Sequence, residues 1–192
     1  MHLEALNDHY ITMLSRQMDT DPMLFVPGEG KAEAPKLVLV GEAPGEQETK
    51  MRRPFVGKAG KNLDGFLDTL GLAREDIYIT NVVKIRPTKQ SERGRLSNRP
   101  PNRREKEAFT PWLMQEIGIL RPRLIVTLGN TPLQALMGEQ ALIGGCHGQL
   151  MRNADGWAVF ALYHPAAIIY NRALAETYQQ DLQLLKQRLG DA

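Results

Sequence analysis

The sequence of 192 residues contains one cysteine, Cys146, and only four histidines. One thiol cannot form an internal disulfide, complete a zinc site by itself or hold an iron–sulfur cluster, which needs about four thiolates. The chain also lacks any run of ~18 apolar residues, so no membrane span is predicted. Residues 1–4 include an acid and are not followed by the apolar segment of a signal peptide. We therefore expect a cytoplasmic protein with no membrane partner and no metal site.

Two glycine-rich patterns of common nucleotide sites are missing as well. The sequence has no P-loop and no Gly-x-Gly-x-x-Gly after a predicted strand. Their absence argues against a nucleotide-binding protein of intermediary metabolism.

The formal net charge is only +2, but the charges are distributed unevenly. Residues 84–106 carry nine Lys or Arg and two acids, which gives this stretch +7 and leaves −5 for the rest of the chain. A basic stretch in a nearly neutral protein is typical of a surface that binds a polyanion such as DNA. A solvated surface loop would have the same composition, so both interpretations stay open.

Short apolar runs alternate with segments of helical periodicity along the whole chain. Strands are predicted at residues 36–41, 77–83, 123–128 and 158–163, with a further edge strand near 149–151. Helices are predicted at residues 1–20, 58–70, 103–119, 131–137 and 173–189. Pro111 predicts a kink or break in its helix, Thr131 is a candidate N-cap, and the three prolines of residues 86–102 predict a long loop.

This alternation predicts the α/β class. We expect a three-layer α/β/α sandwich around a central, mainly parallel four-stranded sheet, with residues 1–192 forming one domain. No internal repeat or low-complexity linker divides the chain.

Polar residues follow the first and last predicted strands. The turn after residues 36–41 holds three glutamates among Gly and Pro, and His164-Pro165 follows residues 158–163. Ligands of open α/β sheets bind at the carboxyl ends of the strands. We therefore predict one polar site assembled from segments that are distant in sequence.

Four segments together resemble the uracil-DNA glycosylase superfamily, nearest its family-four type. They are Gly41-Glu42-Ala43-Pro44-Gly45-Glu46-Gln47-Glu48, Pro54-Phe55-Val56-Gly57-Lys58-Ala59-Gly60, Thr80-Asn81-Val82-Val83-Lys84 with Arg86-Pro87, and Tyr163-His164-Pro165-Ala166-Ala167. They occur in the order and at the spacing of that family. The resemblance implies an enzyme that flips uracil out of DNA and removes it hydrolytically, leaving an abasic site. A catalytically weak relative that recognises damaged or single-stranded DNA is the alternative.

The resemblance implies roles for three side chains. Phe55 would stack on uracil, although it could also be a core residue. The amide of Asn81 offers a donor and an acceptor to the uracil edge, although it could simply cap a turn. His164 would donate to uracil O2 as negative charge develops there, whereas a structural histidine is the alternative.

The turn after the first strand would supply the remaining substrate contacts. By resemblance, Glu42 and Glu48 lie near the sugar and the attacking water, and the sequence does not say which of them activates the water. The backbone of Gly41, Ala43, Pro44 and Gly45 would contact the base or a phosphate.

We expect a monomer whose partner is uracil-containing DNA. Residues that flank the four segments or lie within them would contact this DNA. The candidates are Arg53, Lys58, Lys84, Arg86, Ile168 and Arg172. Ile168 would be an apolar wedge filling the gap left by the flipped base, or else the buried start of the last helix.

The chain departs from the family-four type in its cysteines. That type holds a four-iron, four-sulfur cluster on four cysteines, two near the N-terminus, where residues 1–35 have none. Ile85 and Phe109 stand at or nearest the other two positions. We therefore expect no cofactor, with apolar packing in place of the cluster.

Overall fold

The computed structural model describes residues 2–190, apart from the side chains at 58, 59, 61, 62, 169 and 170. A six-stranded sheet has the order β1-β3-β2-β6-β8-β7. Its strands are β1 Glu29–Gly30, β2 Val38–Gly41, β3 Tyr78–Asn81, β6 Ile125–Leu128, β7 Leu150–Arg152 and β8 Ala158–Leu162. The four inner strands are parallel, and β1 and β7 pair antiparallel at the two edges.

The predicted α/β sandwich is confirmed, but the count of four strands omitted β1, and the edge strand predicted near 149–151 is β7. The two residues of β1 are too few to give a strand pattern, and they pair only because β3 is alongside.

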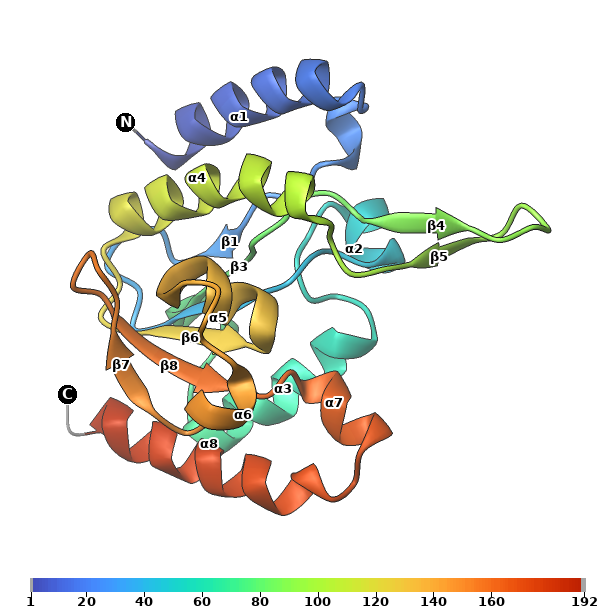
Figure 1. Ribbon diagram of the computed structural model, residues 1–192. Helices are drawn as coiled ribbons and strands as arrows, with labels where there is room; N and C mark the ends of the chain where they lie inside the picture. The colour runs from blue at the N-terminus through green and yellow to red at the C-terminus, as the bar shows by residue number, and fades with distance from the viewer. Residues whose placement is uncertain (1, 191–192) are drawn as a thin grey trace.

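Helices cover both faces of this sheet (Figure 1). One face carries α4 Arg103–Leu120 and α5 Asn130–Met137, with α1 Leu3–Met18 packed on α4, and the other carries α3 Lys58–Leu70, α7 Pro165–Tyr170 and α8 Leu174–Gly190. The remaining short helices are η1 Pro22–Leu24, α2 Glu46–Met51, η2 Arg74–Asp76 and α6 Ile143–Cys146. No helix within residues 2–190 is long and apolar enough to cross a membrane.

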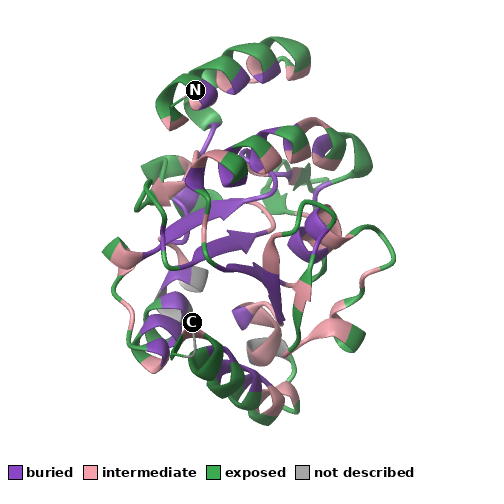
Figure 2. Cartoon of the chain, turned by 90° about the vertical axis from the view of Figure 1, so that its left-hand side faces the viewer, coloured by how far each residue is buried: buried purple, intermediate pink, exposed green. Residues whose placement is uncertain are grey.

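The inner strands are apolar throughout because both of their faces are covered. Val38 and Val40 of β2 pack under α1 and α4, whereas Leu37 and Leu39 pack toward α3 and α8. Figure 2 shows the result as a buried sheet between helices whose outer sides are exposed.

An aromatic cluster attaches α1 to α4. The ring of Tyr10 stacks on Trp112 with centroids 5.4 Å apart, and the ring of Phe109 stacks on Trp112 with centroids 6.2 Å apart. Phe25 adds a third contact, 6.0 Å from Phe109. This packing also explains why α4 continues through Pro111, where a break was one of the predicted outcomes. The missing N–H costs roughly 3 kcal/mol, and the buried side chains on both sides of Pro111 offset it.

The prediction of a long loop over residues 86–102 is wrong. There, β4 Thr88–Gln90 pairs antiparallel with β5 Leu96–Asn98, and this hairpin projects from the body of the protein (Figure 1). Gly94 turns the chain at the tip with φ +75°. The strands lack an apolar alternation because neither of their faces is buried in the core, so the usual strand signal is missing.

Candidate active site at the carboxyl edge of the sheet

The order of the strands reverses at β2, because β3 lies on one side of it and β6 and β8 lie on the other. Such a point opens a crevice at the carboxyl ends of the strands in α/β sheets. Gly41, Asn81, Gly129 and His164 occupy or follow these ends on β2, β3, β6 and β8. The predicted meeting of distant segments at one edge is therefore present in the fold.

Gly41, Asn81 and Phe55 are in direct contact. Gly41 is opposite Asn81 in the parallel register of β2 and β3. A Cβ on Gly41 would lie 2.6 Å from Phe55 Cζ and would also collide with Asn81 Oδ1. Only a glycine therefore allows the amide and the ring to approach the end of β2 together.

The loop that carries Phe55 is held in a strained conformation. Phe55 has φ +53°, in the left-handed region that residues with a side chain rarely adopt. Arg74 donates to Pro54 O at 2.6 Å and to Phe55 O at 3.2 Å. The ring is 5 % exposed and packs with the core cluster of α3 and α8. Phe55 thus has core packing and also contacts Gly41 at the edge of the sheet.

Glu48 orders the turn on which the site depends. Its Oε2 accepts from Gly45 N at 3.1 Å, and its Oε1 accepts from Val56 N at 3.1 Å and Gly57 N at 2.6 Å. Both carboxylate oxygens are therefore used to join the start of α2 to the Phe55 loop. Glu48 is almost fully buried.

Glu42 makes a different contact. Its Oε2 accepts from Thr131 Oγ1 at 2.5 Å, so the hydrogen bond joins the segments that follow β2 and β6. Glu42 is half-buried and has no comparable set of backbone donors among the described residues.

His164 closes the set on β8. It is the N-cap of α7, and its Nδ1 accepts from Ala166 N at 3.1 Å. Since Nδ1 is an acceptor, the neutral ring carries its hydrogen on Nε2 and can donate from there. Burial lowers the pKa of His164, which favours this neutral form. A Cβ on Gly129 would lie 3.5 Å from His164 Cβ, so the end of β6 borders the histidine.

A family model described as the uracil DNA glycosylase superfamily matches residues 27–186. The chain belongs to the uracil DNA glycosylase superfamily.

Relatives of known type agree with this assignment. The type-4 uracil-DNA glycosylase of Pyrobaculum aerophilum is 43 % identical over 166 residues, covering 83 % of this chain and 80 % of the relative. That of Archaeoglobus fulgidus is 37 % identical over 174 residues, covering 86 % and 82 %. The crystal structure of wild-type Pedobacter heparinus SMUG2 shares the fold, with a TM-score of 0.51 at 15 % identity, over 83 % of this chain and 76 % of that one. The resemblance to the superfamily, nearest its type-4 members, is confirmed.

One predicted DNA contact of this superfamily member is wrong. Lys84 is fully buried, and its Nζ is 2.6 Å from Glu116 Oε2 on α4. It cannot reach a phosphate, because its side chain enters the sheet–helix interface at the end of β3. The ion pair could not be predicted from the sequence, because Lys84 belongs to a basic stretch and Glu116 lies 32 residues away.

The other predicted DNA contacts differ in what they touch. Arg53 is paired with Glu29 through two bonds of 2.6 and 2.7 Å, and Arg86 contacts Glu46 at 3.4 Å. Arg172 is exposed, and Ile168 is half-buried against the core cluster of α3 and α8. The side chain of Lys58 lies outside the described part of the chain.

The residues present do not fit the iron–sulfur cluster of family-four members. Ile85 and Phe109 are both buried in the core cluster under α1, and Phe109 contacts the aromatic rings there. Cys146 is the one thiolate the chain can offer. Within residues 2–190, no group of three or more His, Cys, Asp or Glu is placed to hold a metal ion.

The roles of three residues around the site were not predicted from the sequence. Thr131 was predicted as an N-cap, but Gly129 is the cap of α5 and the hydroxyl binds Glu42 instead. Its position directly after a strand end could have indicated this. Arg74 and Glu116 gave no signal, because each acts through a contact at long sequence separation.

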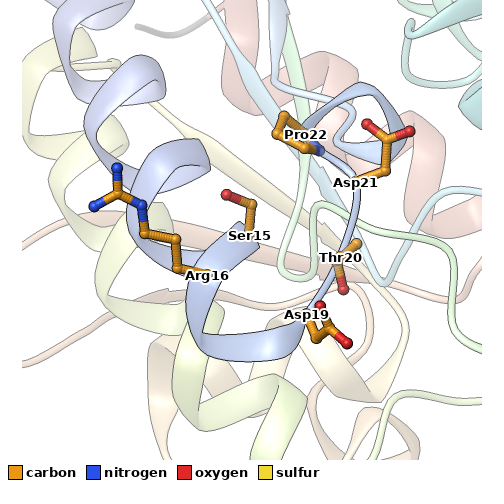
Figure 3. Close-up of a pocket in the computed structure, with 6 residues that line it drawn as sticks. All are labelled: Ser15, Arg16, Asp19, Thr20, Asp21 and Pro22. Atoms are coloured by element: carbon orange, nitrogen blue, oxygen red, sulfur yellow. The ribbon is translucent and has the colours of Figure 1, made fainter.

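A hollow elsewhere on the surface is separate from this edge. It has a volume of about 390 Å³ and lies where α1 ends (Figure 3). Its lining residues are Ser15, Arg16, Asp19, Thr20, Asp21 and Pro22. None of them belongs to a strand end of the sheet.

Proposed function

We propose that this chain is a monofunctional uracil-DNA glycosylase that takes uracil out of the DNA stack and removes it by hydrolysis. The observation that carries the proposal is the contact of Gly41 with both Asn81 Oδ1 and the Phe55 ring. An aromatic face and an amide at one point suit a flipped pyrimidine, which is recognised by stacking and by its Watson–Crick edge.

In this proposal Asn81 selects uracil and Phe55 stacks on it. Uracil presents a carbonyl beside an N–H, which the amide can match with its donor and its acceptor. Cytosine reverses part of this pattern and would leave a buried amide group unpaired, at a cost of about 1–3 kcal/mol. The contact of Phe55 with Gly41 supports this role, because it brings the ring to the same point as the Asn81 amide.

The reaction breaks the bond between C1′ of the sugar and N1 of uracil, and the bonding electrons leave with the base. A water oxygen forms the new bond to C1′, and the proton that the water loses neutralises the departing uracil anion. His164 would donate from Nε2 to uracil O2 as the negative charge develops, which lowers the barrier selectively. The hydrogen bond from Ala166 N to Nδ1 supports this tautomer.

Glu42 and Glu48 have different roles in this proposal. Glu42 is the carboxylate we assign to the attacking water and the sugar charge, because its only described side-chain bond is to Thr131. Glu48 is a positioning residue, since its oxygens are occupied by three backbone N–H groups. The backbone of Ala43, Pro44 and Gly45 would contact the base or a phosphate.

All of these groups come from one chain, so we propose a monomer as the active form. Arg172 is the exposed cation nearest in sequence to His164, and it would contact the DNA backbone. Ile168 would fill the gap that the flipped base leaves in the DNA stack. Arg53 and Arg86 would contact the DNA while they remain paired with Glu29 and Glu46, so each has less free charge to offer a phosphate. Excision would proceed without a cofactor, and the purified protein would show no visible absorbance from iron and sulfide.

A single-uracil oligonucleotide tests the proposal, offered single-stranded and in a duplex and then treated with alkali to cut abasic sites. We expect product from the wild type and a loss of about 10²-fold or more in His164→Ala, as when a charge-stabilising donor is removed. His9→Ala is the matched control, because His9 is exposed on α1. Asn81→Asp should weaken the preference for uracil over cytosine.

Two results would contradict the proposal. Equal activity of His164→Ala and His9→Ala would remove His164 from the chemistry. Absence of product from uracil, hypoxanthine and mismatch substrates, with binding retained, would favour a protein that recognises damaged or single-stranded DNA without excising a base.

A further inference from the structure

We propose that the β4–β5 hairpin, residues 88–98, is an arm that holds the phosphate backbone of the DNA beside the target nucleotide. The inference rests on the proposed function, because it assigns the DNA of that same site. It adds contacts from Lys89, Arg93 and Arg95, which are separate from the residues that act on the base.

The arm has little support from the core. Residues 89–98 are all exposed, and an isolated two-stranded hairpin is only marginally stable in water. A segment of this length that projects from a compact domain is usually functional. Its order therefore requires anchoring at the base and points to a partner along its length.

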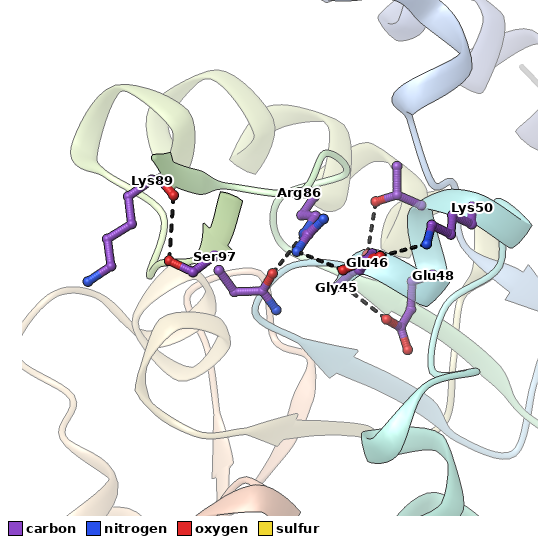
Figure 4. Close-up of polar contacts among 9 residues, drawn as sticks. Gly45, Glu46, Glu48, Lys50, Arg86, Lys89 and Ser97 are labelled. Carbon is purple, nitrogen blue, oxygen red and sulfur yellow. Dashed lines mark hydrogen bonds and ion pairs between the residues drawn. The ribbon is translucent and has the colours of Figure 1, made fainter. Parts of the chain in front are cut away.

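The base of the arm is anchored by two arginines. Arg86 Nε donates to Asn98 Oδ1 at 2.7 Å, and its Nη2 contacts Glu46 at 3.4 Å (Figure 4). Arg99 donates to Thr88 O at 3.0 Å and forms two bonds of 2.6 and 2.7 Å with Glu105. These bonds fix where the arm leaves the body, and they neutralise both arginines.

The cations farther out are not neutralised in this way. Within residues 2–190, no salt bridge of 4.0 Å or less involves Lys89, Arg93 or Arg95. Arg95 acts on Glu46 only from a distance: the pKa of Glu46 is lowered by Lys50 and Arg86 and, least of all, by the charge of Arg95. Glu92 is the arm's single acid. Lys89 is exposed, and in Figure 4 its side chain extends away from Ser97. Exposed cations without salt-bridge partners on one segment are the electrostatic pattern of a phosphate-binding surface.

The pairing of the arm sets its direction relative to the site. Gln90 is opposite Leu96 and Thr88 is opposite Asn98, so these four side chains share one face. Asn98 Nδ2 lies 3.5 Å from where a Cβ on Gly45 would be, so this face adjoins the active-site turn. Leu96 is 54 % exposed on the same face.

Lys89, opposite Ser97, and Arg95, next to Leu96, start on the other face of this narrow hairpin. A DNA strand that delivers a nucleotide to the turn would therefore run along the arm, with Leu96 on one side and the long side chains of Lys89 and Arg95 reaching its phosphates from the other. The tip is about five residues from the base, roughly 16 Å at ~3.3 Å per residue, which is long enough to span more than one phosphate. Leu96 would contact a sugar or base next to the target.

The salt dependence of binding to single-stranded DNA without uracil tests the arm. Neutralising three phosphate contacts should lower the slope of log affinity against log salt by about 2, at ~0.7 per contact. The variant combines Lys89→Gln, Arg93→Gln and Arg95→Gln. The control combines Arg16→Gln, Lys186→Gln and Arg188→Gln, which changes the net charge equally on α1 and α8. Fluorescence anisotropy between 50 and 200 mM salt measures both.

We expect the arm variant to bind at least about 10²-fold more weakly at 50 mM salt and to have the smaller slope, while the control retains the wild-type slope. Equal slopes for the two variants would overturn the proposal. An inactive wild type would contradict the proposed function alone, because the slope is measured on DNA that contains no uracil.

Discussion

Lys84 and Glu116 form an ion pair in which both side chains are fully buried, with Nζ 2.6 Å from Oε2. Nζ also donates to Thr80 Oγ1 and, at 2.8 Å, to Asn81 O, which uses all three of its hydrogens. Tyr78 donates its hydroxyl to Glu116 Oε1 at 2.9 Å. Burial pulls the pKa of Lys84 below its usual range, and the Glu116 carboxylate opposes this shift. The pair thus connects α4 to the strand end that presents Asn81.

Removing one partner of this pair should be costly. Lys84→Met would leave Glu116 buried without its counter-ion, and we expect the free energy of unfolding to fall by about 3–5 kcal/mol. Combining Lys84→Met with Glu116→Leu should restore part of that loss, because no uncompensated charge then remains. Urea unfolding measures both variants. A single variant as stable as the wild type would show that the pair is not a buried ion pair in solution.

Gly41→Ala should damage the site with little effect elsewhere. The added Cβ would displace the Phe55 ring or the Asn81 amide, and misplacement of about 1 Å in a site can cost about 10²-fold in rate. Gly118→Ala is the matched control, because a Cβ there meets no atom within 4 Å on the exposed side of α4. Single-turnover excision of uracil is the measurement. Wild-type rates for Gly41→Ala would contradict the crowding of Phe55 and Asn81 around Gly41.

The bond between Thr131 and Glu42 can be tested by isosteric change. Thr131→Val removes the hydroxyl that donates to Glu42 Oε2, and a hydrogen bond to a charged group contributes about 1.5–3 kcal/mol. We expect the rate of excision to fall by about 10-fold or more at saturating DNA, with a smaller change in affinity. Thr131→Ser keeps the hydroxyl and should recover most of the rate. Equal rates for the Val and Ser variants would mean that the hydroxyl does not orient Glu42.

His164 should respond to pH in a defined direction. Burial lowers its pKa in the folded protein below the ordinary value of about 6.5. The folded state therefore binds the proton less readily than the unfolded chain. The stability from this group is present above the unfolded pKa and is lost as the pH falls through the folded pKa.

Activity should follow the same titration, because a protonated ring can no longer accept the Ala166 N–H at Nδ1. We expect kcat/KM at pH 6.5 to stay near its value at neutral pH and to fall at lower pH. NMR titration of the His164 ring gives its pKa directly. A value at or above 6.5 would contradict the buried neutral ring.

The sequence was sufficient for much of the architecture. Residues 36–41 and 123–128 could be predicted as strands because both faces of the sheet are buried, which makes their side chains apolar without interruption. Helix α3 was predicted with its observed bounds, because its apolar positions recur at helical spacing and Gly71 ends it. The β4–β5 hairpin could not be predicted in the same way, since it packs against no core.

The residue type alone led to a wrong prediction for Lys84, which is buried and not a DNA contact. It was assigned to the basic stretch of residues 84–106, where a lysine is normally solvated, although its immediate neighbours Val83 and Ile85 are apolar. Only the arrival of Glu116 from α4 makes burial of that charge possible. The contact of Arg74 with the Phe55 loop could not be predicted either, because hydrogen bonds to backbone carbonyls leave no pattern in the sequence.

The sequence by itself determined the order of strands and helices, the presence of Glu42, Asn81 and His164 at strand ends and that of Phe55 in a loop, because local periodicity and turn residues are properties of neighbouring positions. The tertiary structure alone decided which of these groups meet and which charges are exposed. Those outcomes depend on strand order and helix packing, which join residues tens of positions apart through contacts of a few ångströms.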